Sequence, residues 1–409
     1  MSLESADARS RRATLPYGRQ LVDEEDIAAV VDVLRGDWLT QGPMIEEFES
    51  AICAATGATY AIAVSSGTAA LHIACIAAGV TPGDTGTTSA ITFVASANCI
   101  RYAGGRPEFC DVDPETGLLS VAALHEQVRA GAPKVIIPVD LAGTPCDLPA
   151  IQHVARECGA VVIEDAAHAV GATYTAGGAE HRAAGCAHSD MAILSFHPVK
   201  HITTGEGGAV TTNDPELAAT LRDLRSHGIT RDPDRLVRDE GPWYYEQHRL
   251  GFNYRITDIQ CALGVNQMRK LERYVARRRE LAARYDRAFA EPAVVDHLRP
   301  LTIPAGRRSS YHLYVIRLLR HDGDSDTDVL QRRRALYDAL RSDGILTQIH
   351  YVPVPRQPDF ERNGLGRGDF PGADAYYAGC LSLPLFPGLA NEDVDRVVAI
   401  VRQALGAAA

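Results

Sequence analysis

Two stretches of the sequence, VVIEDAAHAVGA (residues 161–172) and DMAILSFHPVKHITTGEGGAVTTND (residues 190–214), decide the fold and locate a site. Each contains a short apolar run of the kind that forms a buried strand. The first run ends in Glu164 and Asp165, and the second ends in Ser195, with Lys200 in the turn that follows. An acid and a lysine at the carboxyl ends of two buried strands predict a ligand site at the edge of an open α/β sheet.

The lysine and the acid together favour a pyridoxal phosphate site. A lysine amine can condense with an aldehyde to form a Schiff base, and a carboxylate can hold a pyridine nitrogen protonated so that the ring withdraws electrons. We therefore predict that Lys200 is the catalytic residue and that Asp165 binds the cofactor. Each residue alone has a simpler interpretation: Lys200 as a solvated surface lysine, and Asp165 as a helix cap or a metal ligand.

A turn upstream has the features of a phosphate site. Tyr60–Val64 has the pattern of a strand, and the small residues Ser65-Ser66-Gly67-Thr68-Ala69 after it begin a helix. Free backbone N–H groups and the helix dipole at such a terminus favour phosphate. We expect Gly67, Thr68 and Ala69 to bind the phosphate of the cofactor. Many α/β turns look like this one, and the G-x-G-x-x-G pattern of a dinucleotide site is absent.

Strand and helix patterns alternate along residues 60–163, which predicts βαβ units and a mostly parallel sheet. We also expect an amphipathic helix at residues 23–35 with Ile27, Val30, Val31 and Leu34 on its inner face. Further patterns predict a long helix at residues 257–290 and a strand at residues 348–352. The predicted organisation of this α/β protein is a flexible tail (residues 1–14), a large domain that holds the cofactor (residues 15–262) and a smaller C-terminal α+β domain (residues 263–409).

Composition excludes several classes of function. The 409 residues are 46% hydrophobic and 23% charged, which suits a large core. The net charge of −11 argues against a nucleic-acid surface. Nine scattered cysteines without a C-x-x-C pair predict reduced thiols in a cytoplasmic protein and no metal site. The sequence contains no run of eighteen apolar residues, so we expect no membrane span. Residues 1–14 lack the apolar segment of a signal peptide, so we expect none there.

The motifs SFHPVKHITTGEGG and EDAAHAVGA resemble those of the DegT/StrS sugar aminotransferases, over roughly residues 15–405. The resemblance implies the type I (aspartate aminotransferase-like) fold of pyridoxal phosphate enzymes. It also implies that Phe93 stacks on the cofactor ring, that His168 lies near the ring oxygen and that Ser195 binds the phosphate. Phe93 could equally pack in the core, and a lone histidine such as His168 is more often structural.

The same resemblance implies a substrate pocket and a shared active site. Tyr17, Thr40 and Gln41 would lie near the sugar, and His350 and Tyr351 would lie over the mouth of the site. The segment at residues 226–249 would reach into a neighbouring subunit of a homodimer, where Asn253 would contact the partner's cofactor phosphate. Without the resemblance, residues 226–249 are a long irregular segment of the kind that is usually functional or disordered.

The motifs LPYGRQ, RSHGI and YYEQ-x-x-LG-x-NYR-x-TDIQ-x-ALG are similar to one branch of that family. That branch moves an amino group from L-glutamate to C4 of a UDP-linked 4-keto-6-deoxy-N-acetylhexosamine in pseudaminic acid biosynthesis. Arg231 then becomes a candidate for the diphosphate. The alternatives are a dTDP-keto-sugar aminotransferase, a pyridoxal phosphate-dependent sugar dehydratase and a non-catalytic sensor. Lys200 and the absence of a cysteine cluster argue against the dehydratase.

Overall fold

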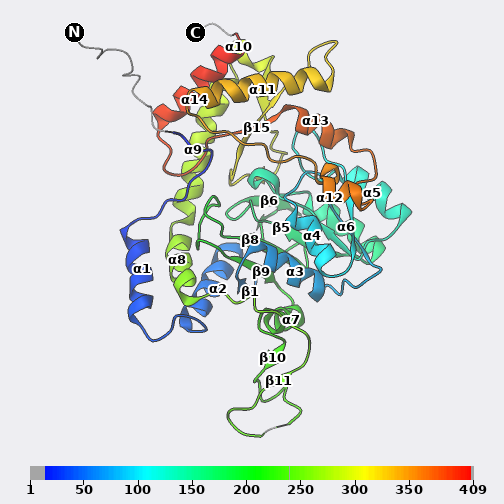
Figure 1. Ribbon diagram of the computed structural model, residues 1–409, viewed down its shortest axis with the longest axis vertical. Helices are drawn as coiled ribbons and strands as arrows, with labels where there is room; N and C mark the ends of the chain where they lie inside the picture. Colours follow the sequence, from blue (N-terminus) through cyan, green and yellow to red (C-terminus); the bar gives the residue numbers. More distant parts are fainter. Residues whose placement is uncertain (1–13, 239, 407–409) are drawn as a thin grey trace, which may run out of the picture.

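The computed structural model describes residues 14–238 and 240–406, so the predicted tail lies outside the described residues except for Thr14. A seven-stranded sheet forms its centre (Figure 1). The strands follow the order β1 (Tyr60–Val64), β9 (Gly208–Thr212), β8 (Met191–Ser195), β5 (Val161–Asp165), β4 (Val135–Ile137), β2 (Thr85–Ser89) and β3 (Arg106–Cys110). All adjacent pairs are parallel except those of β9, which runs antiparallel to β1 and β8. The predicted mostly parallel α/β sheet is confirmed.

Helices cover both faces of this sheet because its strands are apolar on both sides. Along β8, Met191 and Ile193 pack in one core cluster, whereas Ala192 and Leu194 pack in another on the opposite face. The covering helices are α2 (Pro43–Thr56), α3 (Gly67–Ala77), α4 (Ala95–Tyr102), α5 (Val121–Ala130), α6 (Leu148–Cys158), α7 (Pro215–Arg225) and α8 (Asp258–Arg269), with a single 3-10 turn, η1 (Leu141–Gly143), between β4 and α6.

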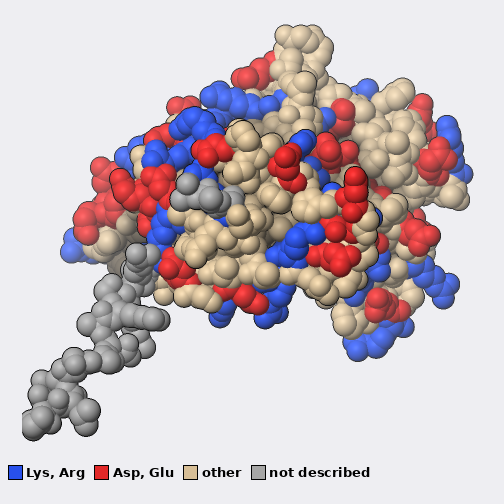
Figure 2. All heavy atoms as spheres, turned by 90° about the horizontal axis from the view of Figure 1, so that it is seen from above, with Lys and Arg blue, Asp and Glu red and all other residues tan. Residues whose placement is uncertain are grey.

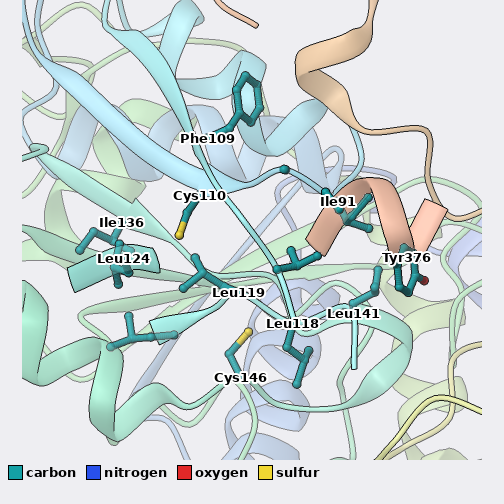
Figure 3. Packing of buried hydrophobic residues seen from close by; sticks show 14 of the residues in the cluster. Ile91, Phe109, Cys110, Leu118, Leu119, Leu124, Ile136, Leu141, Cys146 and Tyr376 are labelled. Carbon is teal, nitrogen blue, oxygen red and sulfur yellow. The ribbon is translucent and has the colours of Figure 1, made fainter. Parts of the chain in front are cut away.

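A third apolar cluster joins the β3 side of the sheet to the C-terminal part of the chain (Figure 3). Leu124 of α5 and Ile136 of β4 are fully buried in it, and so is Tyr376, which is far away in the sequence. The Tyr376 hydroxyl donates to the backbone oxygen of His350 at 2.8 Å. The cluster therefore holds the C-terminal segment that carries His350 and Tyr351 against the main sheet.

The C-terminal part has its own antiparallel sheet, with β14 (Tyr314–Leu318) between β12 (Leu298–Pro300) and β15 (Cys380–Leu383). Its helices are α9 (Leu271–Phe289), α10 (Pro292–Val295), α11 (Asp326–Ser342), α12 (Pro358–Arg362), α13 (Pro371–Gly379) and α14 (Asn391–Ala404), with a 3-10 turn, η2 (Val354–Arg356). The predicted long helix is α8 followed by α9, with a break at Lys270, and α9 runs from the main sheet to this second sheet (Figure 1). The domain boundary at residue 262 stays a prediction.

Two smaller strand pairings lie outside these sheets. In one, β6 (Thr173–Ala176) pairs with β7 (Ala179–Arg182) and β13 (Arg307–Arg308). The other, β10 (Ile229–Thr230) with β11 (Glu246–Gln247), lies in a long hairpin that projects away from the body below α7 (Figure 1). We call residues 226–253 the arm. Trp243 and Leu250 of the arm are 73% and 79% exposed, so these two apolar side chains have little cover within one chain.

The expected inner face of the first helix, α1 (Glu24–Arg35), is right in part: Val30 and Val31 are half-buried, and the prediction is wrong for the other two residues. Ile27 and Leu34 are exposed, and the fully buried residue of α1 is Asp26. Asp26 accepts hydrogen bonds from the side chains of Asn266 and Gln267 on α8, at 2.7 and 2.8 Å. A buried polar network therefore docks α1 on α8, and Ile27 and Leu34 are left facing outward.

The strand expected at residues 348–352 is also wrong. Only Gln348 pairs, through an isolated bridge to Ser382 of β15. The chain leaves the sheet directly afterwards, because the Nδ1 atom of His350 contacts the Ser382 hydroxyl at 2.8 Å and Tyr351 turns toward a cavity. Pro353 and Pro355 then remove two backbone donors that a strand would need.

Acidic and basic side chains are interspersed over the face in Figure 2, without a broad basic area. Among the described residues, no helix is both long and apolar enough to cross a membrane.

Candidate active site

A cavity of about 500 Å³ opens at the carboxyl ends of β5 and β8. This is where the sequence places a ligand, and Asp165 and Ser195, the last residues of these strands, both line it. The structure brings ten of the predicted site residues together in its lining: Tyr17, Gly67, Thr68, Phe93, Asp165, His168, Ser195, Lys200, His350 and Tyr351. The main sheet, α3 and the C-terminal segment all contribute to this lining.

Lys200 lies in a turn that two hydrogen bonds close at Phe196. The Phe196 N–H donates to the Gly207 oxygen at 2.9 Å, and the Phe196 oxygen accepts from the Thr203 hydroxyl at 3.0 Å. Gly205 has a φ of +78°, a conformation that favours glycine. Burial lowers the pKa of Lys200 to about 8, although the Asp165 carboxylate opposes that shift. The amine is therefore available in neutral form at a pH where a free lysine is almost fully charged.

Asp165 is 5% exposed and is held by two donors. The Ser96 hydroxyl donates to Oδ2 at 2.7 Å, and the Ala167 N–H donates to Oδ1 at 3.2 Å. Burial raises the pKa of Asp165, whereas these hydrogen bonds and the nearby Lys200 lower it. A carboxylate so placed still has lone pairs that face the cavity, and it is suited to accept a proton-bearing ring nitrogen.

The first turn of α3 lies at the cavity, where the sequence predicts a phosphate site. Ser66 caps the helix and accepts from the Ala69 N–H at 3.1 Å. The N–H groups of Gly67 and Thr68 belong to that turn and have no partner within the helix. A Cβ atom at Gly67 would lie 3.1 Å from the Cβ and 3.3 Å from the hydroxyl of Ser195. Glycine therefore lets the helix end approach the Ser195 hydroxyl, and both supply donors to one spot.

Neutral histidines surround the lysine. Burial is the main cause that lowers the pKa of His168, His201, His312 and His350, and the charge of Lys200 lowers each of them further. The Nε2 atom of His168 lies 3.3 Å from the Tyr351 hydroxyl, while its buried Nδ1 has no hydrogen-bond partner among the described residues. An unpaired buried imidazole nitrogen at the cavity wall is suited to a polar atom of a bound group.

Phe93 is 56% exposed at the cavity, so it is not the core residue that one interpretation expected. Its ring lies 6.1 Å from the ring of Tyr351. The Tyr17 ring lies 5.4 Å from the ring of His350 on the same wall. These aromatic rings border an open entrance, which suits stacking on a flat ligand.

Five predicted site residues do not line this cavity. Ala69 lies behind it in α3, with its N–H bonded to Ser66. Thr40 pairs with Thr257, and Gln41 follows it with a φ of +56°. The other two, Arg231 and Asn253, belong to the arm, where the Arg231 guanidinium lies 5.7 Å from the ring centre of Tyr245.

Sequence reasoning missed several residues of the lining. Ser96 and Thr92 lie in the segment that carries Phe93, and their hydroxyls contact each other at 2.8 Å. His312 comes from the C-terminal part of the chain. The Thr/Ser content of residues 92–96 gives a weak signal for the first two. Nothing local distinguishes His312, because its position depends on packing between distant segments.

These residues fit pyridoxal phosphate. The site combines three groups: a helix turn at Gly67 where no side chain blocks the backbone, the Asp165 carboxylate, and the Lys200 amine, whose pKa is lowered. Those are the groups that a phosphate, a pyridine nitrogen and an aldehyde require. Among the described residues there is no cluster of histidine, cysteine and acidic side chains that would hold a metal ion.

Comparison with known proteins agrees with this chemistry. Residues 20–402 match the model of the DegT/DnrJ/EryC1/StrS aminotransferase family. The spore coat polysaccharide biosynthesis protein SpsC of Bacillus subtilis is 37% identical over 396 residues, which cover 96% of this chain and 98% of SpsC. Among solved structures, Helicobacter pylori PseC, an aminotransferase involved in the biosynthesis of pseudoaminic acid, aligns with a TM-score of 0.86 and 29% identity over 97% of this chain and 100% of PseC.

A sugar aminotransferase of Streptococcus pneumoniae, described as putative and named Spr1654, aligns with a TM-score of 0.84 and 28% identity over 96% of this chain and 99% of its own in its PLP form. Its PMP form aligns with the same score. These neighbours confirm the expected aminotransferase fold.

Proposed function

The chain belongs to the DegT/DnrJ/EryC1/StrS aminotransferase family, and on that premise we propose that it aminates a nucleotide-linked keto-sugar. The substrate is a UDP-linked 4-keto-6-deoxy-N-acetylhexosamine, and L-glutamate is the amino donor. The product is UDP-4-amino-4,6-dideoxy-N-acetyl-β-L-altrosamine. The observation that carries the reaction type is one cavity that holds both Lys200 and Asp165. The structural likeness to PseC supports the choice of sugar.

Bound pyridoxal phosphate supplies an aldehyde and an electron-withdrawing ring, which together make a carbon–hydrogen bond of the donor acidic. Lys200 anchors the aldehyde carbon and then, as the free amine, takes the proton from the α-carbon of the donor. A pKa of about 8 leaves about a tenth of the amine neutral at pH 7, whereas an ordinary lysine would be almost entirely charged. In the first half of the reaction Lys200 would pass that proton to the carbon that carried the aldehyde. In the second half it would take a proton back from that carbon and deliver it to C4 of the sugar.

The other residues of the lining bind the cofactor and orient its ring. Gly67, Thr68 and Ser195 bind the phosphate through N–H and hydroxyl donors at the start of α3. Asp165 keeps the ring nitrogen protonated, and Phe93 covers one face of the ring and excludes water.

We propose that a second copy of the chain completes the site. The arm projects from the body (Figure 1), and its exposed Trp243 and Leu250 favour burial against a partner. Asn253 would then reach the partner's phosphate, and Arg231 would reach the diphosphate of the partner's sugar.

A complementation experiment tests this sharing. Lys200→Ala and Asn253→Ala chains, each poorly active alone, are mixed and allowed to exchange subunits. If the sites are shared, half of the dimers are mixed and each has one intact site, so about a quarter of the wild-type activity returns. If each chain builds its own site, mixing restores nothing.

The substrate is tested by a half-reaction. The purified enzyme is loaded with pyridoxal phosphate and converted with L-glutamate, which removes its visible absorption band, and the excess donor is washed out. The UDP-linked keto-sugar and its dTDP counterpart are then added separately. We expect the band and an amino-sugar to appear with the UDP sugar. A response to the dTDP sugar alone would keep the reaction and change the substrate, and the absence of both responses would contradict the proposal.

A further inference from the structure

Arg278 of α9 is a fully buried arginine at the junction between the main sheet and the C-terminal sheet. Among the described residues, no carboxylate forms an ion pair with it. Its Nη1 atom faces three backbone oxygens instead, those of Tyr311, His312 and Leu385, at 3.3, 3.1 and 2.9 Å. Burial of a charge without a counter-ion is costly. This cost suggests that the guanidinium does more than fill space.

Two of the three oxygens belong to a tight turn at residues 309–312. Tyr311 has a φ of +52°, which is strained for a bulky side chain. The turn is tied to the site on both sides: the Ser310 hydroxyl donates to the His168 oxygen at 3.3 Å, and the Ser310 oxygen lies 3.2 Å from Nε2 of His201. Arg278 therefore stabilises a strained turn that contacts His168 of the cavity lining and His201, the residue that follows Lys200 in the sequence.

The turn places His312 in that wall. The His312 ring centre lies 4.3 Å from that of His168 and 5.6 Å from that of His201. His168 has one ring nitrogen near the Tyr351 hydroxyl and one without a partner among the described residues. Hydrogen bonding therefore does not fix the His168 ring at both nitrogens, and the packing of His312 against it supplies the missing restraint.

The hydrogen bonds of Arg278 hold the backbone that places His312, and its charge helps to keep the His312 and His201 rings neutral. Burial lowers the pKa of His312 and of His201, and the nearby guanidinium lowers both further. Arg278 itself stays charged at neutral pH, because burial lowers its pKa only to about 9. Neutral rings can pack together, whereas two charged rings at this separation would repel each other.

We propose that Arg278 is a positioning residue of the site: by holding the backbone at Tyr311 and His312 it sets the His312 ring against His168, and so sets the His168 ring in the cavity. The consequence for transamination rests on the proposed function, whereas the ordering of the histidines does not. A loosened His168 ring should slow the chemical step more than it weakens donor binding, because small misplacements near a reacting centre are costly.

The test compares Arg278→Met, which keeps the length and removes charge and donors, with Arg278→Lys, which keeps the charge. Arg284→Met on the same helix is the matched control, because Arg284 pairs with Asp395 at the surface. Circular dichroism establishes the fold of each variant. Histidine ring resonances of the cofactor-free chain, assigned with single histidine variants, are followed between about pH 5 and pH 8.

We expect the His312 and His168 resonances to move in Arg278→Met, and at least one of the two rings to begin to titrate in this range. The lysine variant should show a smaller change, and Arg284→Met none. In the loaded enzyme, kcat for the donor half-reaction should fall about tenfold in Arg278→Met with little change in KM. Arg278→Lys should recover part of that loss.

A folded Arg278→Met with a lower thermal midpoint but unmoved histidine resonances would show a purely structural role and overturn the proposal. If Arg278→Met does not fold, Arg278→Lys decides, and unmoved resonances together with wild-type kcat in that variant would overturn it. Failure of the wild-type enzyme with every donor would refute the proposed function, and the histidine spectra would still decide the role of Arg278.

Discussion

The hydroxyl of Ser96 is the strongest donor to the buried Asp165, and its removal gives a sharp test of the site. Ser96→Ala deletes the 2.7 Å hydrogen bond to Oδ2 and leaves the 3.2 Å contact from the Ala167 N–H. Ser96 is itself fully buried. The carboxylate then has less stabilisation in a site where burial already raises its pKa.

The expected shift follows from the energy of one hydrogen bond. A bond to a charged group contributes about 1.5–3 kcal/mol, and one pKa unit corresponds to about 1.4 kcal/mol. The pKa of Asp165 should therefore rise by about one to two units. A larger fraction of Asp165 becomes protonated on mild acidification, and protonated Asp165 no longer accepts from a protonated ring nitrogen. Activity should be lost at a higher pH than in the wild type.

The assay is the pH dependence of kcat/KM for the L-glutamate half-reaction, which reports the free enzyme. We expect the acid limb to move to higher pH by at least about one unit. Thr88→Val is the matched control, because it removes a buried hydroxyl that donates at 2.9 Å to the Ile137 oxygen and not to Asp165. An acid limb that stays in place in Ser96→Ala, or that moves equally in the control, would refute the reasoning.

Three further predictions concern the lysine, the cradle and a buried acid pair. Burial lowers the pKa of Lys200 to about 8. The rate at which the cofactor-free chain binds pyridoxal phosphate, followed by stopped-flow absorbance, should therefore rise with pH around a midpoint near that value. A midpoint near the pKa of an ordinary lysine, about 10.4, would contradict this. Gly67→Ala crowds Ser195 and should raise the cofactor dissociation constant about tenfold, a cost of about 1.4 kcal/mol, in a fluorescence titration. Burial and the neighbouring Glu164 raise the pKa of Asp140, so the free energy of unfolding of the wild type should fall as pH rises above about 4. In urea unfolding, Asp140→Asn should make this dependence on pH less steep. An unchanged dependence would exclude a proton held at Asp140.

The sequence was sufficient for the part of the site that local patterns encode. Strand ends, a small-residue turn and a helix start are short-range features, and they place Asp165, Lys200 and Gly67 in one cavity. Polar side chains that act through distant partners leave no such pattern. His312 reaches the cavity through the backbone contacts of Arg278, and a single sequence does not show which arginine of a basic run is buried.

The error at α1 has a related physical cause. Periodicity assigns an apolar stripe to the core because burial of apolar surface usually dominates. Here Asp26 is buried instead, and the Nζ atom of Lys270 lies 3.1 Å from its Oδ1. A satisfied polar network can replace an apolar contact between two helices. The stripe with Ile27 and Leu34 is then left on the surface, where only knowledge of a partner would explain it.

The charges around the cavity explain why a shared site would serve this fold. Among the described residues, Lys200 is the only lysine or arginine in the lining, and its chemistry requires it to be neutral for part of the cycle. A phosphate bound here would therefore depend on the α3 N-terminus and hydroxyl groups, which carry only partial charges. A further donor such as Asn253, brought by the arm of a second copy, would strengthen phosphate binding without adding a cation that suppresses the ionisation of Lys200 or of the histidines. An arginine in the same place would bind phosphate more tightly and would lower the pKa of Lys200 further, which would weaken its ability to accept a proton.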